Sequence, residues 1–420
     1  MNINLKNKSV LLGVTGSISA YKACDLARLF VKAGANVRVV MTPSAEKFIS
    51  PLTFEALTRN SVLTSESESW ASNLNHIDIG KESDIFIIAP ATANSLNKIS
   101  KGIADNILLE SALAFRGEII LAPSANTQML ENHYTRGSIK MLEVNDYTIV
   151  KPQTKVLACG DNGDGALADV EDIFYVGVRA LLKDDFWNER RVVVTGGATK
   201  EKIDEVRYIS NYSSGKMANS LALSLYLKGA DVCYLSTNSH NLPKDIYSID
   251  VESSEEMLDY TKDAIRVAKK PKVSKASLNN SDRYMMDKKP YLFMVSAVSD
   301  YTPKFAQKGK LKKSMIGENW SIECVQTQDI LSNIDKDGIH TVAFKAEMDI
   351  ENGEQNAINL LSQKDVEAVC YNHLDSSNSF GTDDNRIKFI TKDSIKDLGK
   401  ASKIELSFKI LDEAKTLIDE

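Results

Sequence analysis

The fold is decided by a short apolar run that opens into a glycine turn, and the chain carries it twice, as Val10-Leu-Leu-Gly-Val-Thr-Gly-Ser-Ile-Ser-Ala20 and as Val192-Val-Val-Thr-Gly-Gly-Ala-Thr199. Such a turn joins a buried strand to a helix, where backbone N–H groups can receive a phosphate. On spacing alone, each turn could equally serve close packing of a helix on a strand. Two such starts nevertheless predict two nucleotide-type sites.

Length and composition indicate the class of protein. At 420 residues the chain can hold two α/β domains of about 200 residues each. Hydrophobic residues make up 43% of the chain and charged residues 26%, which is typical of a soluble globular protein. The net charge of −6 excludes a general attraction to nucleic acid or to anionic membranes. Positive charge for an anionic ligand must therefore be concentrated locally.

The cysteines and the N-terminal residues bear on the cellular compartment. The five cysteines are odd in number and scattered, without a CxxC pair, which argues against a disulfide framework and a structural zinc site. The first residues lack the apolar core of a signal peptide, and no apolar run approaches membrane-spanning length. We therefore expect a cytoplasmic protein with no membrane segment.

Strand-like and helix-like segments alternate in the first half of the chain. Helical apolar spacing covers Ala20–Ala33 and Asn106–Phe115. Buried strands are expected at Val10–Val14, Val37–Met41, Ile85–Ala89 and Ile119–Ala122. Such alternation predicts an α/β fold, a parallel sheet covered on both faces, with ligands at the carboxyl ends of its strands.

A second α/β domain follows a closing helix at Glu171–Leu182 and a charged segment, Lys183–Arg191, that we interpret as a linker. We therefore expect domains at 1–185 and 186–420. The lysine-rich stretch Arg266–Pro290 is interpreted as a solvated surface loop. Strands of the second domain are expected at Val192–Thr195, Asp231–Ser236, Leu292–Val295, Thr341–Phe344 and Ala368–Tyr371.

Two loops of the first domain are rich in small polar residues directly after a strand. They are Ala89-Pro-Ala-Thr-Ala-Asn-Ser95 and Ala122-Pro-Ser-Ala-Asn-Thr-Gln-Met129. The carboxyl ends of parallel strands share one sheet edge, so Asn126 is expected at the edge reached by the first loop. Helix capping by Thr92 or Asn94 is the simpler explanation of the first loop.

A histidine and a cysteine complete the candidates in this half. His76 precedes an expected strand in Asn75–Ile79 and would lie near the same edge, although a lone histidine is usually structural. Cys159 lies in the glycine-rich, acidic run Leu157-Ala-Cys-Gly-Asp-Asn-Gly-Asp-Gly165, which favours a flexible loop over a core position.

Together with Gly13–Lys22, these segments resemble the homo-oligomeric flavin-containing cysteine decarboxylases, a flavodoxin-like family that binds FMN. The resemblance implies that His76 and Asn126 belong to the catalytic site, with the asparagine gripping the substrate carboxylate. It implies that Cys159, on a mobile flap, delivers a proton. FMN contacts are implied for Gly16, Ser17, Ile18, Thr42, Thr92, Ala93 and Asn94.

The implied reaction explains these residue types. FMN would withdraw two electrons from the cysteine side chain, and the resulting thioaldehyde would act as the electron sink for loss of CO₂. Re-reduction of the resulting ene-thiolate then needs a hydride from the reduced flavin and a proton from an acid such as Cys159. The chain departs from the family at Ala125, Leu130 and Ala166, where Met, an aromatic residue and Arg are usual.

The second half resembles the phosphopantothenate–cysteine ligase family, most closely in Ile203-Asp-Glu-Val-Arg207 and Ile209-Ser-Asn-Tyr-Ser-Ser-Gly-Lys-Met217. A helix cap would need one Ser or Asn there, not five polar positions. Further matching segments are Thr195–Thr199, Ser296–Tyr301, Lys310–Lys313, Gln328–Leu331, Val342–Glu347 and Cys370–His373.

This second resemblance implies that CTP, with Mg²⁺, activates the carboxylate of 4′-phosphopantothenate and that the amine of L-cysteine attacks the acyl-cytidylate. Asn211 would stabilise the acyl-cytidylate, Lys310 would offset charge on the phosphates, and Asp300 would bind Mg²⁺. The chain departs from the family at Leu360 and Gln328, where Lys and Pro are common, and Lys345 or the lysine-rich stretch Arg266–Pro290 could compensate. CTP contacts are implied for Asp300, Lys310, Gln328, Asp329, Ile330, Leu331, Phe344 and Lys364.

The two resemblances cover nearly the whole chain in the order of the bifunctional coenzyme A biosynthesis family, a phosphopantothenoylcysteine decarboxylase fused to a phosphopantothenate–cysteine ligase. They imply small-molecule partners, no nucleic acid, and a homo-oligomer of trimeric flavin domains and dimeric ligase domains, up to a dodecamer. One alternative is that only the ligase is active and the flavoprotein domain serves binding or assembly. A nicotinamide-dependent reductase fits less well, because neither start completes Gly-x-Gly-x-x-Gly and Val37–Met41 does not end at an acidic residue.

Overall fold

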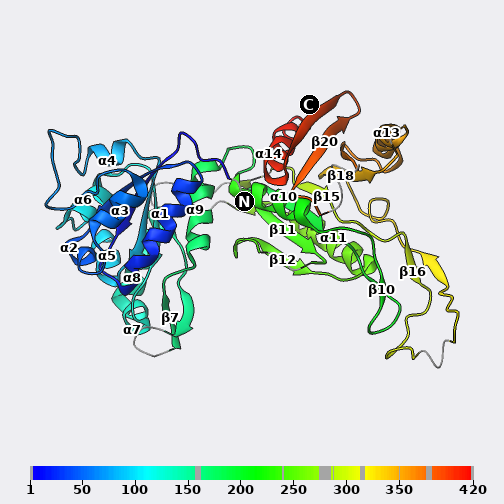
Figure 1. The fold of residues 1–420 in the computed structure, drawn as a ribbon, viewed down its shortest axis with the longest axis horizontal. Coiled ribbons are helices and arrows are strands. Elements are labelled where there is room, and N and C mark those ends of the chain that lie inside the picture. Colours follow the sequence, from blue (N-terminus) through cyan, green and yellow to red (C-terminus); the bar gives the residue numbers. More distant parts are fainter. Residues whose placement is uncertain are drawn as a thin grey trace. The chain divides into compact units, whose positions relative to one another are not determined.

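The computed structural model describes residues 3–156, 162–238, 241–273, 285–286, 288–312, 317–349, 351–374 and 381–417. The chain forms two compact units (Figure 1). The first comprises Asn2–Lys183 together with Val273–Met285, and the second comprises Asp184–Lys272 and the chain from Met286 onward. Each unit is an α/β structure built on its own parallel sheet.

The first unit contains a five-stranded parallel sheet in the order β2-β1-β3-β4-β5. This is the strand order of flavodoxin-like doubly wound sheets. Its central strand β3 is buried along its whole length, and the neighbouring strands β1 and β4 are buried after their first residue, because both faces of the sheet are covered. The strands are β1 (Ser9–Val14), β2 (Asn36–Met41), β3 (Ile85–Ala91), β4 (Glu118–Pro123) and β5 (Thr148–Ile149), so all four strands expected in this half are confirmed.

Helices cover both faces of this sheet. The first face packs against α1 (Lys22–Lys32) and α9 (Val170–Leu182), and the second against α5 (Ala93–Ile99), α6 (Ile107–Ala114) and α8 (His133–Val144). The shorter elements are η1 (Ile18–Tyr21), α2 (Pro43–Glu46), α3 (Pro51–Thr58), α4 (Asp78–Lys81), α7 (Thr127–Glu131) and the hairpin strands β6 (Gln153–Val156) and β7 (Asn162–Ala166).

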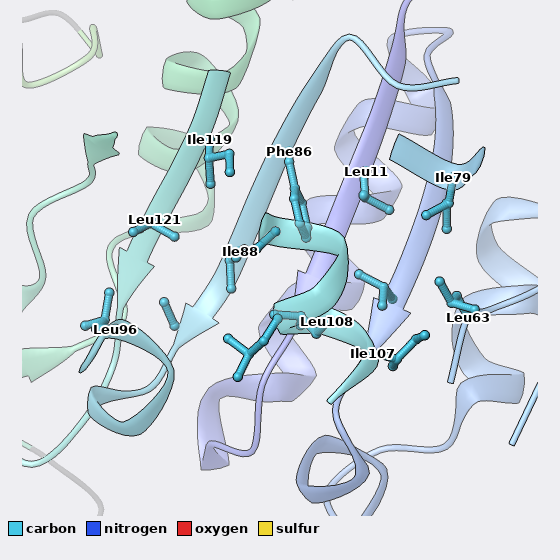
Figure 2. Packing of buried hydrophobic residues seen from close by; sticks show 14 of the residues in the cluster. Leu11, Leu63, Ile79, Phe86, Ile88, Leu96, Ile107, Leu108, Ile119 and Leu121 are labelled. Atoms are coloured by element: carbon cyan, nitrogen blue, oxygen red, sulfur yellow. The ribbon is translucent and has the colours of Figure 1, made fainter. Parts of the chain in front are cut away.

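Figure 2 shows the core on the second face, where Leu11, Phe86 and Leu121 project from three neighbouring strands toward α6. Leu108 of that helix is fully buried against them. The burial of such aliphatic side chains contributes about 1.5–3 kcal/mol each. This packing fixes the sheet edge at which the post-strand loops gather.

The expectation of a strand in Asn75–Ile79 is wrong. These residues lead into the helical turn α4 instead. The side-chain oxygen of Asn75 accepts hydrogen bonds from the backbone nitrogens of Ile77 (3.0 Å) and Asp78 (2.9 Å), so it nucleates a turn. Local alternation of polar and apolar residues was outweighed by this side-chain cap.

The second unit contains an eight-stranded sheet in the order β12-β11-β8-β15-β18-β19-β20-β21. Its first six strands are parallel, in the 3-2-1-4-5-6 order of dinucleotide-binding sheets, and the last two form an antiparallel hairpin at one edge. All five strands expected in this half are present. The strands are β8 (Arg191–Gly196), β11 (Asp231–Ser236), β12 (Tyr247–Asp250), β15 (Tyr291–Met294), β18 (His340–Glu347), β19 (Ala368–His373), β20 (Asp384–Thr391) and β21 (Ile395–Ser402).

Helices again cover both faces. On one face α10 (Lys216–Leu227) and α14 (Lys403–Ala414) pack against each other, and the other face carries α11 (Ser254–Ala268) and α13 (Gly353–Gln363). The same part of the chain also forms small two-stranded sheets: β9 (Glu201–Lys202) with β10 (Tyr208–Ile209), β16 (Tyr301–Pro303) with β17 (Cys324–Gln326), and β13 (Lys272–Val273) with β14 (Met285–Met286).

The interpretation of Lys183–Arg191 as a charged linker is incomplete, because Trp187 within it is fully buried. Its ring lies 4.9 Å from the ring of Tyr291 and 4.9 Å from that of Phe186. Asp184 pairs with Lys415 of the C-terminal segment at 2.9 Å. This segment therefore belongs to the core of the second unit. Among the described residues, no helix is both long and apolar enough to cross a bilayer.

Candidate active sites

The first unit has a pocket of about 520 Å³ where the loops after β1, β2, β3 and β4 meet. Six of the seven residues predicted to contact FMN line it: Gly16, Ser17, Thr42, Thr92, Ala93 and Asn94. The seventh, Ile18, lies in η1 with 60% of its surface exposed and is not among the lining residues.

Short hydrogen bonds fix the shape of this pocket. The hydroxyl of Thr15 donates to the carbonyl oxygen of Pro90 (2.7 Å) and accepts from the nitrogen of Thr92 (3.1 Å), which ties the first loop to the third. A Cβ atom on Gly16 would lie 2.5 Å from the Cβ of Ser44. Only glycine lets these two loops approach so closely.

The pocket is electrically balanced. Its charged lining residues, Lys98 and Asp105, pair with each other at 2.6 Å. The hydroxyl of Ser124 lies 3.3 Å from that of Ser17 and 3.1 Å from that of Ser19. Hydroxyl and backbone N–H groups therefore provide the donors, a set that fits a phosphate held by neutral groups.

The predicted catalytic residues of this unit lie in different surroundings. His76 is half-buried, its Nδ1 lies 2.8 Å from a carboxylate oxygen of Glu68, and the ring of Trp70 meets it edge-on at 5.7 Å. Asn126 begins α7, where its side-chain oxygen accepts from the nitrogen of Gln128 (2.9 Å). Neither side chain lines the pocket. Cys159 lies outside the described residues.

The β6–β7 hairpin, which flanks the undescribed residues 157–161, docks on the Asn126 loop. The nitrogen of Ala125 donates to the carbonyl oxygen of Gly165 at 3.1 Å. A Cβ on Gly163 would collide with Thr127, and one on Gly165 with the carbonyl oxygen of Ala125. The glycines of this run are therefore required for close approach, a packing role in addition to the predicted flexibility.

Two departures from the decarboxylase pattern have structural explanations. Leu130 is buried in the core beside the sheet and does not line the pocket, whereas Met129, its neighbour, does. Ala125 lines the pocket directly. Of these two departures from the family pattern, the one at Ala125 therefore changes a residue that lines the pocket.

The second unit has a pocket of about 540 Å³ at the carboxyl ends of β8, β15, β18 and β19. It brings together Asn211, Asp300 and Phe344, which the sequence placed in the ligase site. The side-chain nitrogen of Asn211 donates to the carbonyl oxygen of Val298 at 2.9 Å. This bond joins the polar string before α10 to the loop after β15.

Arg207 lies in the same polar segment before α10 and connects it to another loop. Its guanidinium pairs with the fully buried Asp204 carboxylate, and this hydrogen bond holds the pKa of Asp204 well below its usual range. Arg207 also donates to the carbonyl oxygen of Leu311 (3.1 Å) and stacks 4.2 Å from the ring of Trp320. Lys310 lies on the loop that Arg207 holds through Leu311. Its side chain is exposed and does not line the pocket.

The segment Gln328–Leu331 lies next to Asp300. The nitrogen of Thr327 donates to the carbonyl oxygen of Asp300 at 2.9 Å, and Asp329 pairs with Lys364 at 2.9 Å. Gln328 is exposed. Ile330 is buried and Leu331 half-buried in the core. None of these four side chains nor Lys364 lines the pocket, and Leu360, which lies on α13, packs against the core.

Two lysines of this pocket were not predicted as site residues. Lys216 begins α10, and Lys403 begins α14 with only 7% of its surface exposed. Lys345, which the sequence offered as a substitute cation, also lines the pocket and pairs with Glu347 at 3.0 Å. Lys216 stood in the quoted string, but Lys403 gave only a helix-start signal, Ser402 followed by Glu405.

A metal site formed by protein alone is not found among the described side chains, which contain no group of three or more His, Cys, Asp and Glu residues placed to hold an ion. Among the described residues that line the second pocket, Asp300 is the single carboxylate. Mg²⁺ prefers six oxygen ligands. Asp300 could therefore hold Mg²⁺ only together with phosphate oxygens.

Two family models match the chain. Flavoprotein matches residues 2–181, and DNA/pantothenate metabolism flavoprotein C-terminal domain matches residues 187–277 and 271–417. The two matches together cover both units.

Relatives match over almost their full length. The chain is 33% identical over 422 residues to Coenzyme A biosynthesis bifunctional protein CoaBC of Haemophilus influenzae, with 98% of each chain covered. It is 32% identical over 418 residues to the protein of that name from Bacillus subtilis, again with 98% of each covered. A solved PPC decarboxylase mutant complexed with pantothenoylaminoethenethiol is 32% identical, with 40% of this chain and 96% of that chain covered and a TM-score of 0.38.

Proposed function

The chain belongs to the family of bifunctional coenzyme A biosynthesis proteins, with a flavoprotein decarboxylase domain and a ligase domain, and from that premise we propose the chemistry of each unit. The second unit joins L-cysteine to 4′-phosphopantothenate at the expense of CTP. The first unit then converts the product to 4′-phosphopantetheine with FMN. The observation that carries the proposal is the convergence of Asn211, Asp300 and Phe344 on one lysine-lined pocket.

The ligase pocket has the groups that carboxylate activation requires. A carboxylate is a poor electrophile because its leaving group would be oxide, whereas an acyl-cytidylate has a good leaving group. Asn211, held by the carbonyl oxygen of Val298, offers a preorganised amide to the acyl-cytidylate. Lys310, on the loop fastened by Arg207, offsets negative charge on the phosphates.

The remaining CTP contacts surround Asp300. The aromatic ring of Phe344 lines the pocket, and the Asp329–Lys364 pair lies beside the backbone that contacts Asp300. Gln328, Ile330 and Leu331 contribute through their backbone in this proposal, because two of these side chains pack in the core. Mg²⁺ arrives with the triphosphate and contacts Asp300, since the protein supplies too few oxygens alone.

The decarboxylase pocket fits FMN through its neutral donors. Gly16, Ser17 and the loop Thr92–Asn94 hold the phosphate, Thr42 lines the wall between them, and Ile18 contacts the cofactor from outside the pocket. When bound, FMN supplies the two-electron oxidation that turns the cysteine side chain into an electron sink for loss of CO₂.

The protein's own groups then handle the carboxylate and the protons. Asn126 grips the substrate carboxylate, and Glu68 fixes the ring orientation of His76. Cys159 donates the final proton to the product carbon. We also propose a homo-oligomer of trimeric flavin units and dimeric ligase units.

The test supplies 4′-phosphopantothenate, CTP, Mg²⁺ and L-cysteine to the purified chain. Release of both pyrophosphate and CO₂ is expected. Pyrophosphate without CO₂ would support the alternative in which the flavoprotein unit serves binding or assembly. If the chain releases neither pyrophosphate nor CO₂, the proposal is overturned.

The variant Cys159→Ser tests the last step separately. We expect CO₂ release to persist while the saturated amine product is lost, because the serine hydroxyl is a much weaker acid than a thiol. A normal yield of 4′-phosphopantetheine from this variant would remove Cys159 from the mechanism.

A further inference from the structure

Two helices of the second unit begin with a lysine at the same pocket. Lys216 is the first residue of α10 and Lys403 is the first residue of α14. The two helices pack against each other on one face of the sheet, and both lysines line the pocket that contains Asn211 and Asp300. Residues far apart in the sequence thus place two ammonium groups at one wall.

Lys403 is an unusual lysine because only 7% of its surface is exposed. Its Nζ donates to the carbonyl oxygen of Thr382 and lies 3.5 Å from that of Asp384. Burial lowers the pKa of Lys403, and the nearby charge of Lys216 lowers it further. Lysine is almost never buried to this extent without a paired anion.

Lys216 is held by a partner that can be exchanged. Its Nζ lies 2.7 Å from a carboxylate oxygen of Asp383 and donates to the carbonyl oxygen of Gly381 at 2.9 Å. The Asp383 side chain is 89% exposed. Exposed ion pairs contribute little to stability, so a ligand with more negative charge can displace this carboxylate.

Lysines outnumber carboxylates in the lining of this pocket. Its described charged residues are Lys216, Lys345 and Lys403 with Asp300, and the partners of Lys216 and Lys345, Asp383 and Glu347, do not line it. A positive side chain at the first position of a helix is also unfavourable, because the helix dipole is positive there. An anion at this wall would relieve both repulsions.

We propose that Lys216 and Lys403 form a phosphate-binding subsite of the ligase pocket, in which Asp383 occupies Lys216 until a substrate phosphate takes its place. This inference rests on the proposed ligase function. The phosphate comes either from the triphosphate of the nucleotide or from 4′-phosphopantothenate, and the same experiment distinguishes the two sources.

The experiment uses the full chain and the variants Lys216→Met, Lys403→Met and Asp383→Asn. Lys409→Met is the matched control, because Lys409 lies on α14 but pairs with Glu405 away from the pocket. Initial rates of pyrophosphate release give the KM of each substrate. Loss of a charge-assisted contact to phosphate is expected to raise one KM about tenfold or more in both lysine variants. The control stays within about twofold, and Asp383→Asn lowers the same KM about two- to fivefold because the competitor is gone.

The pattern of KM values assigns the source. A rise in the KM for CTP assigns the subsite to the triphosphate. A rise in the KM for 4′-phosphopantothenate that disappears with unphosphorylated pantothenate assigns it to that substrate. Folded Lys216→Met and Lys403→Met variants, with both KM values within about twofold of the unmodified chain, would overturn the proposal. If Lys403→Met does not fold, Lys216→Met and Asp383→Asn decide by the same criteria.

Calorimetric binding of inorganic tripolyphosphate to the full chain separates this inference from the ligase proposal. Binding weakened about fivefold or more by both lysine substitutions supports the subsite even if the unmodified chain releases no pyrophosphate. Equal binding by all variants, in a chain that does release pyrophosphate, overturns the subsite and leaves the ligase function in place.

Discussion

The two pockets are nearly equal in size, about 520 and 540 Å³, yet they offer opposite kinds of donor. The first is lined by hydroxyl and backbone groups, and its charged residues, Lys98 and Asp105, neutralise each other. The described lining of the second has three lysines and one aspartate, and the carboxylates that pair with two of these lysines, Asp383 and Glu347, do not line the pocket. Neutral donors suit a phosphate held permanently in one geometry, whereas excess charge attracts a polyanion that enters and leaves at every turnover. The difference indicates a resident cofactor in one unit and a transient substrate in the other.

The largest expected effect isolates the second pocket. Asn211→Ala should lower the ligase rate about 10²- to 10³-fold, as loss of a preorganised donor to a developing charge does. CO₂ release from supplied phosphopantothenoylcysteine, measured with the same sample, should be unchanged. A parallel fall of both activities would show that the two pockets do not function independently.

The next effect isolates the first pocket. In Gly16→Ala the new Cβ meets Ser44, and overpacking of this kind costs about 1–3 kcal/mol. Flavin affinity should therefore weaken about 10- to 100-fold, measured by visible absorbance after dialysis, while the ligase rate is retained. Gly137→Ala is the matched control, because nothing lies within 4 Å of a Cβ there. Full flavin retention by Gly16→Ala would contradict the assignment of this pocket to FMN.

A smaller effect tests how the first unit orients its histidine. Glu68→Gln keeps the shape of the side chain but removes the charge opposite His76 Nδ1. Hydrogen bonds to charged groups contribute about 1.5–3 kcal/mol, so the decarboxylation rate should fall about tenfold or more. The flavin content should not change. Glu66→Gln on the same loop serves as the control, and equal rates for the two variants would remove Glu68 from the mechanism.

The smallest effect concerns salt. Raising potassium chloride from about 50 to about 500 mM shortens the screening length severalfold. The KM for CTP should rise about three- to tenfold, because the second pocket acts through charge, while flavin retention by the neutral pocket changes less than about twofold. The reverse pattern would contradict the contrast between the two pockets.

Parts of both units were predictable from sequence because their signals are local. The apolar run Val192–Thr195 forms β8, and the glycine turn after it lines the pocket as expected. Likewise, Gly16 and Thr92 follow strands directly and reach the first pocket through chain connectivity alone. To predict such a position, it is enough to know where a strand ends and at which edge of the sheet that end lies.

Other features were misjudged because a distant partner decides them. Trp187 is flanked by charged residues, which suggested a linker, but the rings of Tyr291 and Phe186 bury it. Arg207 received no role from the sequence, yet the structure shows it paired with Asp204 and holding the Lys310 loop. Lys403 gave no functional signal, because its role depends on α14 packing beside α10.

The sequence by itself determined that the chain has two parallel α/β units and which loops follow their strands, because periodicity and glycine turns are short-range properties of the chain. The order of the two chemistries followed from the resemblance of its motifs to two families. Only the tertiary structure decided the charge of each pocket. That charge depends on where the ion-pair partners lie: Lys98 pairs with Asp105 inside the first pocket, whereas Lys216 pairs with Asp383, which does not line the second pocket, and Lys403 donates to a backbone carbonyl oxygen. Electrostatic balance is a sum over neighbours in space, and those neighbours come from segments that the linear order does not bring together.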